Sequence, residues 1–240
     1  MDQLTGNVIN RGIAYGRVYK RFENEIINTP QSHHIDQMDV LMTALSNSAQ
    51  QLDELARITH YELSEGVSII FEAHKLMIND PMILERAKAL IAQNHSAYNA
   101  YRTASDEVIG VFEKLDNDYM KNRIIDIEDA AERVLSAIEN VQYGFELQFP
   151  SPRILLLEKM KPSVLVNCHK DSILGIVSAS GSYNQHSGTI VRIKDIPTLV
   201  IKGVMEAIHE KDRVLIDAVR GVLYRNPSMD FVNKLMKERR

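Results

Sequence analysis

The hydrophobic period of the sequence changes twice, and this change constrains the fold more than any other feature. Residues 5–20 contain glycines and alternate apolar with polar side chains around Ile13, Tyr15 and Val18, which predicts a strand or a short hairpin. From residue 33 to residue 140, apolar side chains recur every three or four positions. Short apolar runs return after Phe149. A long helical block therefore interrupts a chain that begins and ends with strands.

The helical block carries several helix-start signals. Asp80 followed by Pro81 is a favoured N-cap and first helical residue, and Ser96 fits a further N-cap. An apolar face with a 3-4-3-4-3 spacing comprises Met38, Leu41, Leu45, Ser48, Leu52 and Leu55. The expected helices cover residues 33–64 and 66–79, one from Pro81, one from Ser96 to about 115, and one from about 117 to 140. Together they predict an all-helical bundle.

The remainder of the chain alternates short strands with short helices. The apolar runs are 154–157, 173–177, 199–201, 214–216 and 222–224, and the helical candidates are 162–168, 187–194 and 204–210. This alternation is typical of an α/β fold, and the segment at 5–20 is expected to complete its sheet. We therefore expect an α/β domain of residues 1–30 and 145–228, an inserted bundle of residues 33–143, and a linker helix at 229–240.

Composition excludes several classes of partner. Lys and Arg number 28 and Asp and Glu 32, so a net charge of −4 gives no reason to expect nucleic acid or an anionic membrane. No apolar run approaches the roughly 20 residues of a membrane helix, and the start of the chain does not resemble a secretion signal. We expect a cytoplasmic protein. The single Cys168 is expected to be a small packed or half-exposed thiol, although its neighbour His169 leaves a nucleophile possible.

His186 is the best candidate for chemistry among the eight histidines, none of which has zinc-site spacing, so no metal site is expected. It follows an apolar strand and the small residues 178–182, and it precedes a helical run to Lys194. The start of a helix favours anions, and a neutral imidazole is a nucleophile. The alternative is an ordinary surface histidine in a loop.

The segment 175–200 resembles the phosphohistidine loop of Enzyme I of the phosphoenolpyruvate sugar phosphotransferase system. In that family the loop reads roughly G-F-x-T-D-x-G-G-R-T-S-H-T-[SA]-I-[ML]-A-R, followed by L-P-A-[IV]-V. The positions that match without a gap are Gly175, Gly181, His186, Arg192, Pro197 and Val200. The family's histidine takes a phosphoryl group from phosphoenolpyruvate and passes it to the histidine carrier protein HPr. The resemblance implies that His186 is the phosphohistidine, with phosphate and loop support from Lys161, Gly181, Ser187 and Arg192.

Four further segments resemble the same family in order along the chain: GIAYGRVY at 12–19, IFEAHKLMINDP at 70–81, LDNDYMKNRIIDIEDAAERVL at 115–135 and IDAVRGVLYRNPS at 216–228. The bundle motifs distinguish it from pyruvate phosphate dikinase, which shares the swivelling domain but lacks the HPr-binding bundle. The resemblance implies an α/β swivelling phosphohistidine domain with an inserted helical bundle that binds HPr. The implied docking residues are His74, Leu76, Met77, Phe112, Tyr119 and Arg123. For Leu76, Met77 and Phe112, burial in the bundle core is an equally good interpretation.

Several loop positions depart from the family pattern. The family's acidic residue is Ala179, its arginine, threonine and serine are Tyr183, Asn184 and Gln185, and the threonine that bonds the histidine is Lys161. Lost orienting bonds usually lower activity, whereas Lys161 could supply a positive charge in place of the arginine. These changes leave three functions open: active phosphoryl transfer, a weakened or inactive module that binds an HPr-like protein for regulation, and an enzyme with another phosphodonor.

Nothing in the sequence resembles the family's barrel domain, which binds phosphoenolpyruvate and magnesium. The chain is therefore expected to be a fragment, with a free-standing relative as the alternative. The resemblance implies a phosphoenolpyruvate-protein phosphotransferase that does not use phosphoenolpyruvate without that domain. The expected partners are an HPr-like phosphocarrier and the chain's own C-terminal domain, with no cofactor in this chain.

Overall fold

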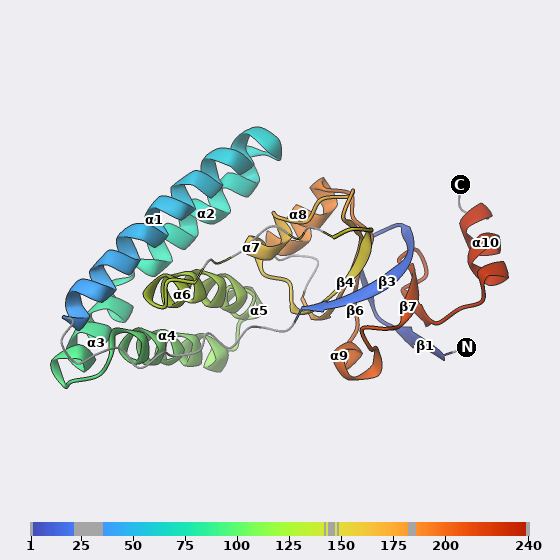
Figure 1. Ribbon diagram of the computed structural model, residues 1–240. Coiled ribbons are helices and arrows are strands. Elements are labelled where there is room, and N and C mark those ends of the chain that lie inside the picture. The colour runs from blue at the N-terminus through green and yellow to red at the C-terminus, as the bar shows by residue number, and fades with distance from the viewer. Residues whose placement is uncertain are drawn as a thin grey trace. The chain divides into compact units, whose positions relative to one another are not determined.

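The computed structural model describes residues 2–21, 36–141, 143, 147, 149–181 and 186–238. The chain divides into two compact units, one of residues 1–23 with 146–240 and one of residues 24–145 (Figure 1). The second unit is inserted in the sequence of the first. No helix among the described residues is long and apolar enough to cross a membrane.

The described part of the inserted unit is helical. Its elements are α1 (Gln37–Glu62), α2 (Glu65–Ile78), α3 (Pro81–Ala92), α4 (Ala97–Lys114), α5 (Asp118–Lys121) and α6 (Ile124–Ile138). The predicted caps are confirmed, because the Asp80 carboxylate accepts from the Met82 amide and the Ser96 hydroxyl oxygen accepts from the Asn99 amide. Asp36 caps α1 in the same way, so this helix starts later than the sequence indicated.

The prediction of one helix from about residue 117 to 140 is wrong. The chain makes a turn at residues 122–123, which separates α5 from α6. The amide of Arg123 bonds to the carbonyl of Met120, three residues earlier, and this tighter turn interrupts the α-helical ladder. Arg123 is thereby placed at the start of α6, with Tyr119 one turn before it in α5.

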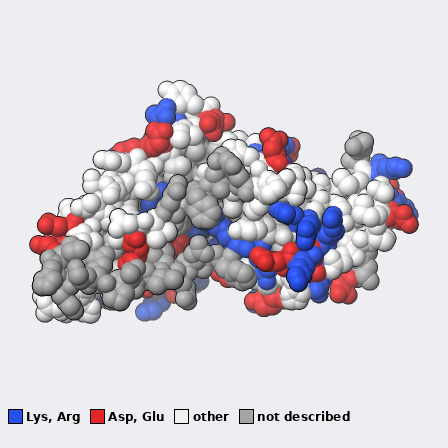
Figure 2. All heavy atoms as spheres, viewed as in Figure 1, with Lys and Arg blue, Asp and Glu red and all other residues white. Residues whose placement is uncertain are grey.

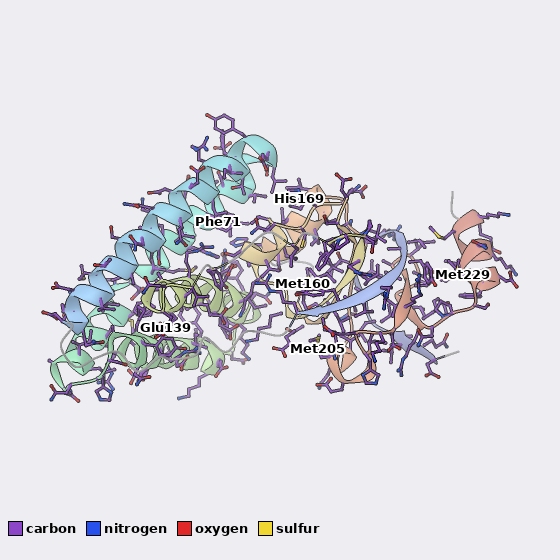
Figure 3. The ribbon with its side chains drawn as sticks, viewed as in Figure 1. Phe71, Glu139, Met160, His169, Met205 and Met229 are labelled. Carbon is purple, nitrogen blue, oxygen red and sulfur yellow. The ribbon has the colours of Figure 1, made fainter. Side chains whose placement is uncertain are left out.

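The core of the helical unit is formed by α1, α2, α3, α4 and α6. The largest fully buried side chains include Leu41, Leu52, Phe71 (Figure 3), Ile78 and Tyr101. Ser48 is also fully buried, as its place on the apolar face of α1 predicts. Burial of each large apolar side chain stabilises the unit by about 1.5–3 kcal/mol.

The α/β unit holds eight strands in the order β1-β8-β7-β3-β4-β5-β6-β2. Their bounds are β1 (Asp2–Thr5), β2 (Asn7–Asn10), β3 (Ile13–Arg21), β4 (Arg153–Lys159), β5 (Ile173–Ser180), β6 (Thr198–Val200), β7 (Arg213–Asp217) and β8 (Val222–Arg225). Strands β3, β4, β5 and β6 pair in parallel, and the other pairs are antiparallel. The five predicted apolar runs all fall in strands, although 199–201 extends one residue beyond β6.

The sheet closes on itself, which the sequence did not predict. Strands β1 and β2 stand at opposite ends of the strand order, yet one residue, Gly6, joins them. The amide of Gly6 bonds to the carbonyl of Gly221, and a Cβ on Gly6 would lie 2.2 Å from the carbonyl oxygen of Val200. Only glycine fits between the two sheet ends. The expectation of a single strand or a hairpin over 5–20 is therefore wrong.

Buried apolar side chains from most of the strands share one face and form a common core. Four short helices accompany the sheet: α7 (Pro162–Leu165), α8 (His186–Ile193), α9 (Val204–Ala207) and α10 (Met229–Lys237). Val204 and Met205 of α9 belong to this core, whereas α10 packs on the other face against Leu215 and Tyr224. The predicted fold class, an α/β unit with an inserted helical bundle, is confirmed.

Candidate functional site

His186 is the first residue of α8 and is half-buried. The helix follows β5, whose last residue, Ser180, lies beside Lys159 at the carboxyl ends of two parallel strands. Ligands of α/β proteins bind at such strand ends, and the first amides of a helix lack intrahelical acceptors. The predicted position of His186, on a strand-to-helix connection at a helix start, is therefore confirmed. Residues 182–185 lie outside the described part of the chain, and with them the substitutions at Tyr183, Asn184 and Gln185.

Gly181 directly follows β5 and has a backbone geometry that disfavours any other residue. Its φ is +149°, and an added Cβ would lie 2.9 Å from the Sδ atom of Met160. Met160 is fully buried just after β4 (Figure 3). The hydroxyl of Ser178 donates to the carbonyl of Ser180, and the Ser180 hydroxyl donates to the carbonyl of Glu158. These contacts fix the chain as it leaves the sheet toward His186.

The other predicted supporting residues have different environments. Lys161 is buried at the start of α7, directly after β4. Ser187 is buried beside His186, and its hydroxyl has no hydrogen-bond partner among the described residues. Arg192 donates to the hydroxyl of Thr189 near the end of α8. Its backbone lies six positions after His186, roughly 9 Å along the helix, and this hydrogen bond directs its guanidinium one turn toward the helix start.

Cys168 is a packed thiol, the first of the two predicted environments, and is not half-exposed. Its side chain is fully buried, and burial raises the pKa of the thiol to about 12. The thiol approaches the carbonyl of Val164 at 3.5 Å, and Lys194 donates to the carbonyl of Cys168. A thiol that stays protonated at neutral pH is a poor nucleophile, so the nucleophile alternative is wrong.

The predicted docking residues of the helical unit divide into three groups. Leu76 and Tyr119 are exposed, with 76% and 64% of their surface accessible, so the core alternative is wrong for Leu76. Met77, Phe112 and Arg123 are half-buried. His74 is fully buried in α2, so the prediction that it contacts a partner directly is corrected. A side chain without exposed atoms cannot be touched by a protein that docks on this surface.

His74 instead ends a chain of polar contacts that reaches the surface. Its Nε2 lies 3.7 Å from Oδ1 of Asp126, and its Nδ1 lies 3.9 Å from Oδ2 of Asp129. The second oxygen of Asp126 accepts from Arg123 at 3.4 Å. Arg123 also donates to the Tyr119 hydroxyl at 2.6 Å, and its guanidinium lies 4.9 Å from the Tyr119 ring centroid. The buried histidine is thus linked through the half-buried Arg123 to the exposed Tyr119.

Further exposed apolar side chains on these helices were missed: Ile69 on α2, Met82 on α3, and Val111 with Leu115 on or next to α4. For one of these residues the sequence carries a signal. Ile69 and Leu76 are seven residues apart, so they share a face of α2. Among the described residues, no group of three His, Cys, Asp or Glu side chains is placed to hold a metal ion.

Two family models match the chain. The N-terminal domain of phosphoenolpyruvate-utilising enzymes matches residues 5–123, and the mobile domain of these enzymes matches residues 149–221. The chain therefore belongs to the phosphoenolpyruvate-utilising enzymes.

The similar curated proteins are more specific. Phosphoenolpyruvate-protein phosphotransferases from Priestia megaterium and Bacillus subtilis are 28% and 26% identical over 98% of the chain. The chain spans 42% of the length of each. A solution structure of Enzyme I shares the fold with a TM-score of 0.69 at 22% identity, covering 98% of this chain and 97% of that one. The N-terminal domain of Enzyme 1 – Nitrogen has a TM-score of 0.58 at 18% identity, with 98% of both chains covered.

Proposed function

We propose that His186 carries a phosphoryl group between proteins in the cytoplasm, and that the helical unit docks an HPr-like phosphocarrier. The observation that carries this proposal is the position of His186 at the start of α8, beyond the carboxyl ends of parallel strands, in the domain that matches the mobile domain of the family. In the longer relatives, the part of the protein beyond the matched region would be the domain that binds phosphoenolpyruvate, the donor of the phosphoryl group. We assign magnesium and phosphoenolpyruvate to that C-terminal domain and no cofactor to this chain.

The transfer from a phosphorylated carrier exchanges one P–N bond for another. A ring nitrogen of His186 offers its lone pair to phosphorus, the bond from phosphorus to the carrier's histidine breaks, and the carrier's nitrogen recovers its lone pair. Attacking and leaving groups have similar character, so the module lowers the barrier mainly by positioning and by stabilising the phosphoryl oxygens. The amides at the start of a helix such as α8 are suited to this second task.

Two neighbours are assigned supporting roles. The buried hydroxyl of Ser187 adjoins His186 and, having no partner among the described residues, is available to donate to a phosphoryl oxygen. Lys161 is buried after β4, where a positive charge would favour the phosphorylated form of the site. An unchanged rate of phosphorylation in Lys161→Ala would exclude this role of Lys161.

On the docking side, exposed Leu76 and Tyr119 are suited to an apolar contact, and Arg123 supplies a positive charge beside Tyr119. Aromatic, arginine and large apolar side chains dominate binding energy at protein interfaces. Met77 and Phe112 are half-buried and would contribute only part of their surface.

The experiment mixes the chain with its cognate phosphorylated carrier and measures acid-labile, base-stable phosphate on the chain. Label is expected on the native chain and on His169→Ala, which removes another histidine of the same unit (Figure 3), and none on His186→Ala. Label that persists in His186→Ala would overturn the assignment.

A second function is a regulatory module that binds the carrier without turnover. It is favoured by Ala179 and Lys161, which stand where the family has an acidic residue and a histidine-bonding threonine. Binding of the phosphorylated carrier without any label on the chain would support this function over the first.

A further inference from the structure

Three arginines stand side by side on one face of the closed sheet. The backbone register places Arg17 of β3 opposite Arg213 of β7 and beside Arg153 of β4. Residues paired across neighbouring strands project to the same face, and adjacent strands are about 4.8 Å apart. The arginine row (Arg17, Arg153 and Arg213) therefore spans roughly 10 Å. Figure 2 shows Lys and Arg side chains over the part of the unit where β3 and β7 run, with Asp and Glu side chains among them.

The row faces away from the common core of the sheet. Alternate residues of β3, Ala14 and Val18, belong to that core, so Arg17 between them projects outward. Arg17 and Arg213 are exposed and Arg153 is half-buried. All three can therefore be reached from solvent.

Among the described residues, nothing neutralises these guanidiniums. The carboxylate next in sequence, Asp212, accepts from Arg225 at 2.8 Å and from the Asn226 side chain at 2.8 Å. The guanidinium of Arg213 instead lies 6.0 Å from the ring centroid of Tyr15, a cation–π contact that leaves its charge in place. Like charges directly opposite each other destabilise a strand pair, so the row costs stability unless an anion binds it.

Aromatic side chains flank the row on both sides. Tyr15 and Tyr19 project from the same face of β3 as Arg17, one before it and one after it. The side chain of Tyr15 packs against the apolar cluster that includes Tyr224 of β8 and Val232 of α10. The ring of Tyr19 packs on Phe149 with centroids 4.7 Å apart. These packed borders hold the backbone of β3 in place, so the spacing of the three arginines along the row is fixed before a ligand binds.

We propose that the arginine row is a binding site for a compact oligophosphate anion. The planar guanidinium matches the paired oxygens of a phosphate, and three of them in a row match a short run of linked phosphates. A long nucleic acid fits less well, because the basic surface is short and the chain carries a net charge of −4.

This site is separate from the phosphohistidine. Arg153 opens β4 at the amino end of the parallel strands, whereas His186 follows the opposite, carboxyl end. Lys159 lies six positions after Arg153 in β4, a distance of roughly 20 Å along the strand. The proposal therefore does not depend on phosphoryl transfer at His186.

The test is isothermal titration of the 240-residue chain with inorganic triphosphate at low salt, without added metal. The variants are Arg17→Gln and Arg153→Gln, and the matched control is Arg11→Gln, an exposed arginine of the same unit outside the row. Wild type and control are expected to bind equally, and the row variants more weakly by about tenfold or more. Binding should weaken as salt is raised.

A second measurement tests whether the arginines of the row repel one another when no anion is bound. In urea without triphosphate, Arg17→Gln is expected to unfold at a higher midpoint than wild type, because it removes a like-charge contact. Equal triphosphate affinity in all variants, or no binding by wild type, would overturn the proposal.

Two further ligands distinguish the source of the anion. Tighter binding of a nucleoside triphosphate than of triphosphate would support a nucleotide as the ligand, and equal binding would support oligophosphate in general. A single-stranded oligonucleotide that binds more tightly than both would overturn the proposal of a compact ligand.

Discussion

The Nε2 atom of His74 lies 3.7 Å from Oδ1 of Asp126, and both side chains are buried in the helical unit. His74 comes from α2 and Asp126 from α6, so the contact joins two helices that pack against each other. The same carboxylate reaches Arg123, and Arg123 reaches the exposed Tyr119. The buried His74 is therefore connected, through Asp126 and Arg123, to Tyr119 of the proposed docking surface.

Replacing His74 with alanine should destabilise the helical unit by about 2–4 kcal/mol. The change opens a cavity and leaves Asp126 and Asp129 without the buried imidazole between them. Urea unfolding would measure the loss, with His60→Ala, an exposed histidine of α1, as the control. A loss no larger than that of the control would contradict the structural role assigned to His74.

Leu76→Ala should weaken carrier binding by about tenfold while leaving the free energy of unfolding within about 0.5 kcal/mol of wild type. The side chain is largely exposed, so its removal disturbs little of the core. Titration with the carrier, alongside the comparably exposed Tyr61→Ala on α1, would check this. If both variants bind like wild type, Leu76 does not belong to the docking surface.

Gly181→Ala should cost about 1–3 kcal/mol of stability and slow phosphorylation of His186. The substitution forces an unfavourable φ of +149° on alanine and places its Cβ against Met160. Gly110→Ala is the matched control, because a Cβ at that position in α4 meets nothing within 4 Å. Alanine favours helix more than glycine does, so the control should gain up to about 1 kcal/mol. Equal effects of the two substitutions would argue against strain at Gly181.

The stability of the α/β unit should fall at high pH through Cys168. Burial raises the pKa of the folded thiol to about 12 from a reference of 9.0, so the unfolded chain loses its proton first. The stabilising contribution is complete below about pH 9 and is lost as pH rises toward 12, by at most about 1.4 kcal/mol per pH unit. Unfolding of wild type and Cys168→Ala between pH 8 and about 10.5 measures this. Parallel pH profiles of the two proteins would contradict it.

The features predicted from the sequence are those that depend on local patterns. Asp80 with Pro81 and Ser96 mark helix starts because a cap acts on amides two or three residues away. The placement of His186 at the start of α8 follows from the same kind of local signal. His74 could also have been placed in the core, since the 3-4 spacing of Val67, Phe71, His74 and Ile78 puts it on a buried stripe.

The features that were missed depend on contacts distant in sequence. The alternation of apolar and polar side chains in β1 and β2 would be the same with any neighbouring strands. Only the closed sheet therefore reveals that Gly6 joins its two ends. The arginine row is likewise invisible until the register brings Arg17, Arg153 and Arg213 together. The break before α6 depends on the tight turn at Arg123, which apolar spacing does not signal.

The measurement that tests the central claim most directly is localisation of the phosphoryl group by peptide mapping. The native chain, labelled by its cognate phosphorylated carrier, would be digested at alkaline pH, where phosphohistidine survives, and its peptides analysed by mass spectrometry. The account predicts one modified residue, His186 at the start of α8. A phosphoryl group on another histidine would contradict it, as would a chain that binds the carrier and stays unmodified.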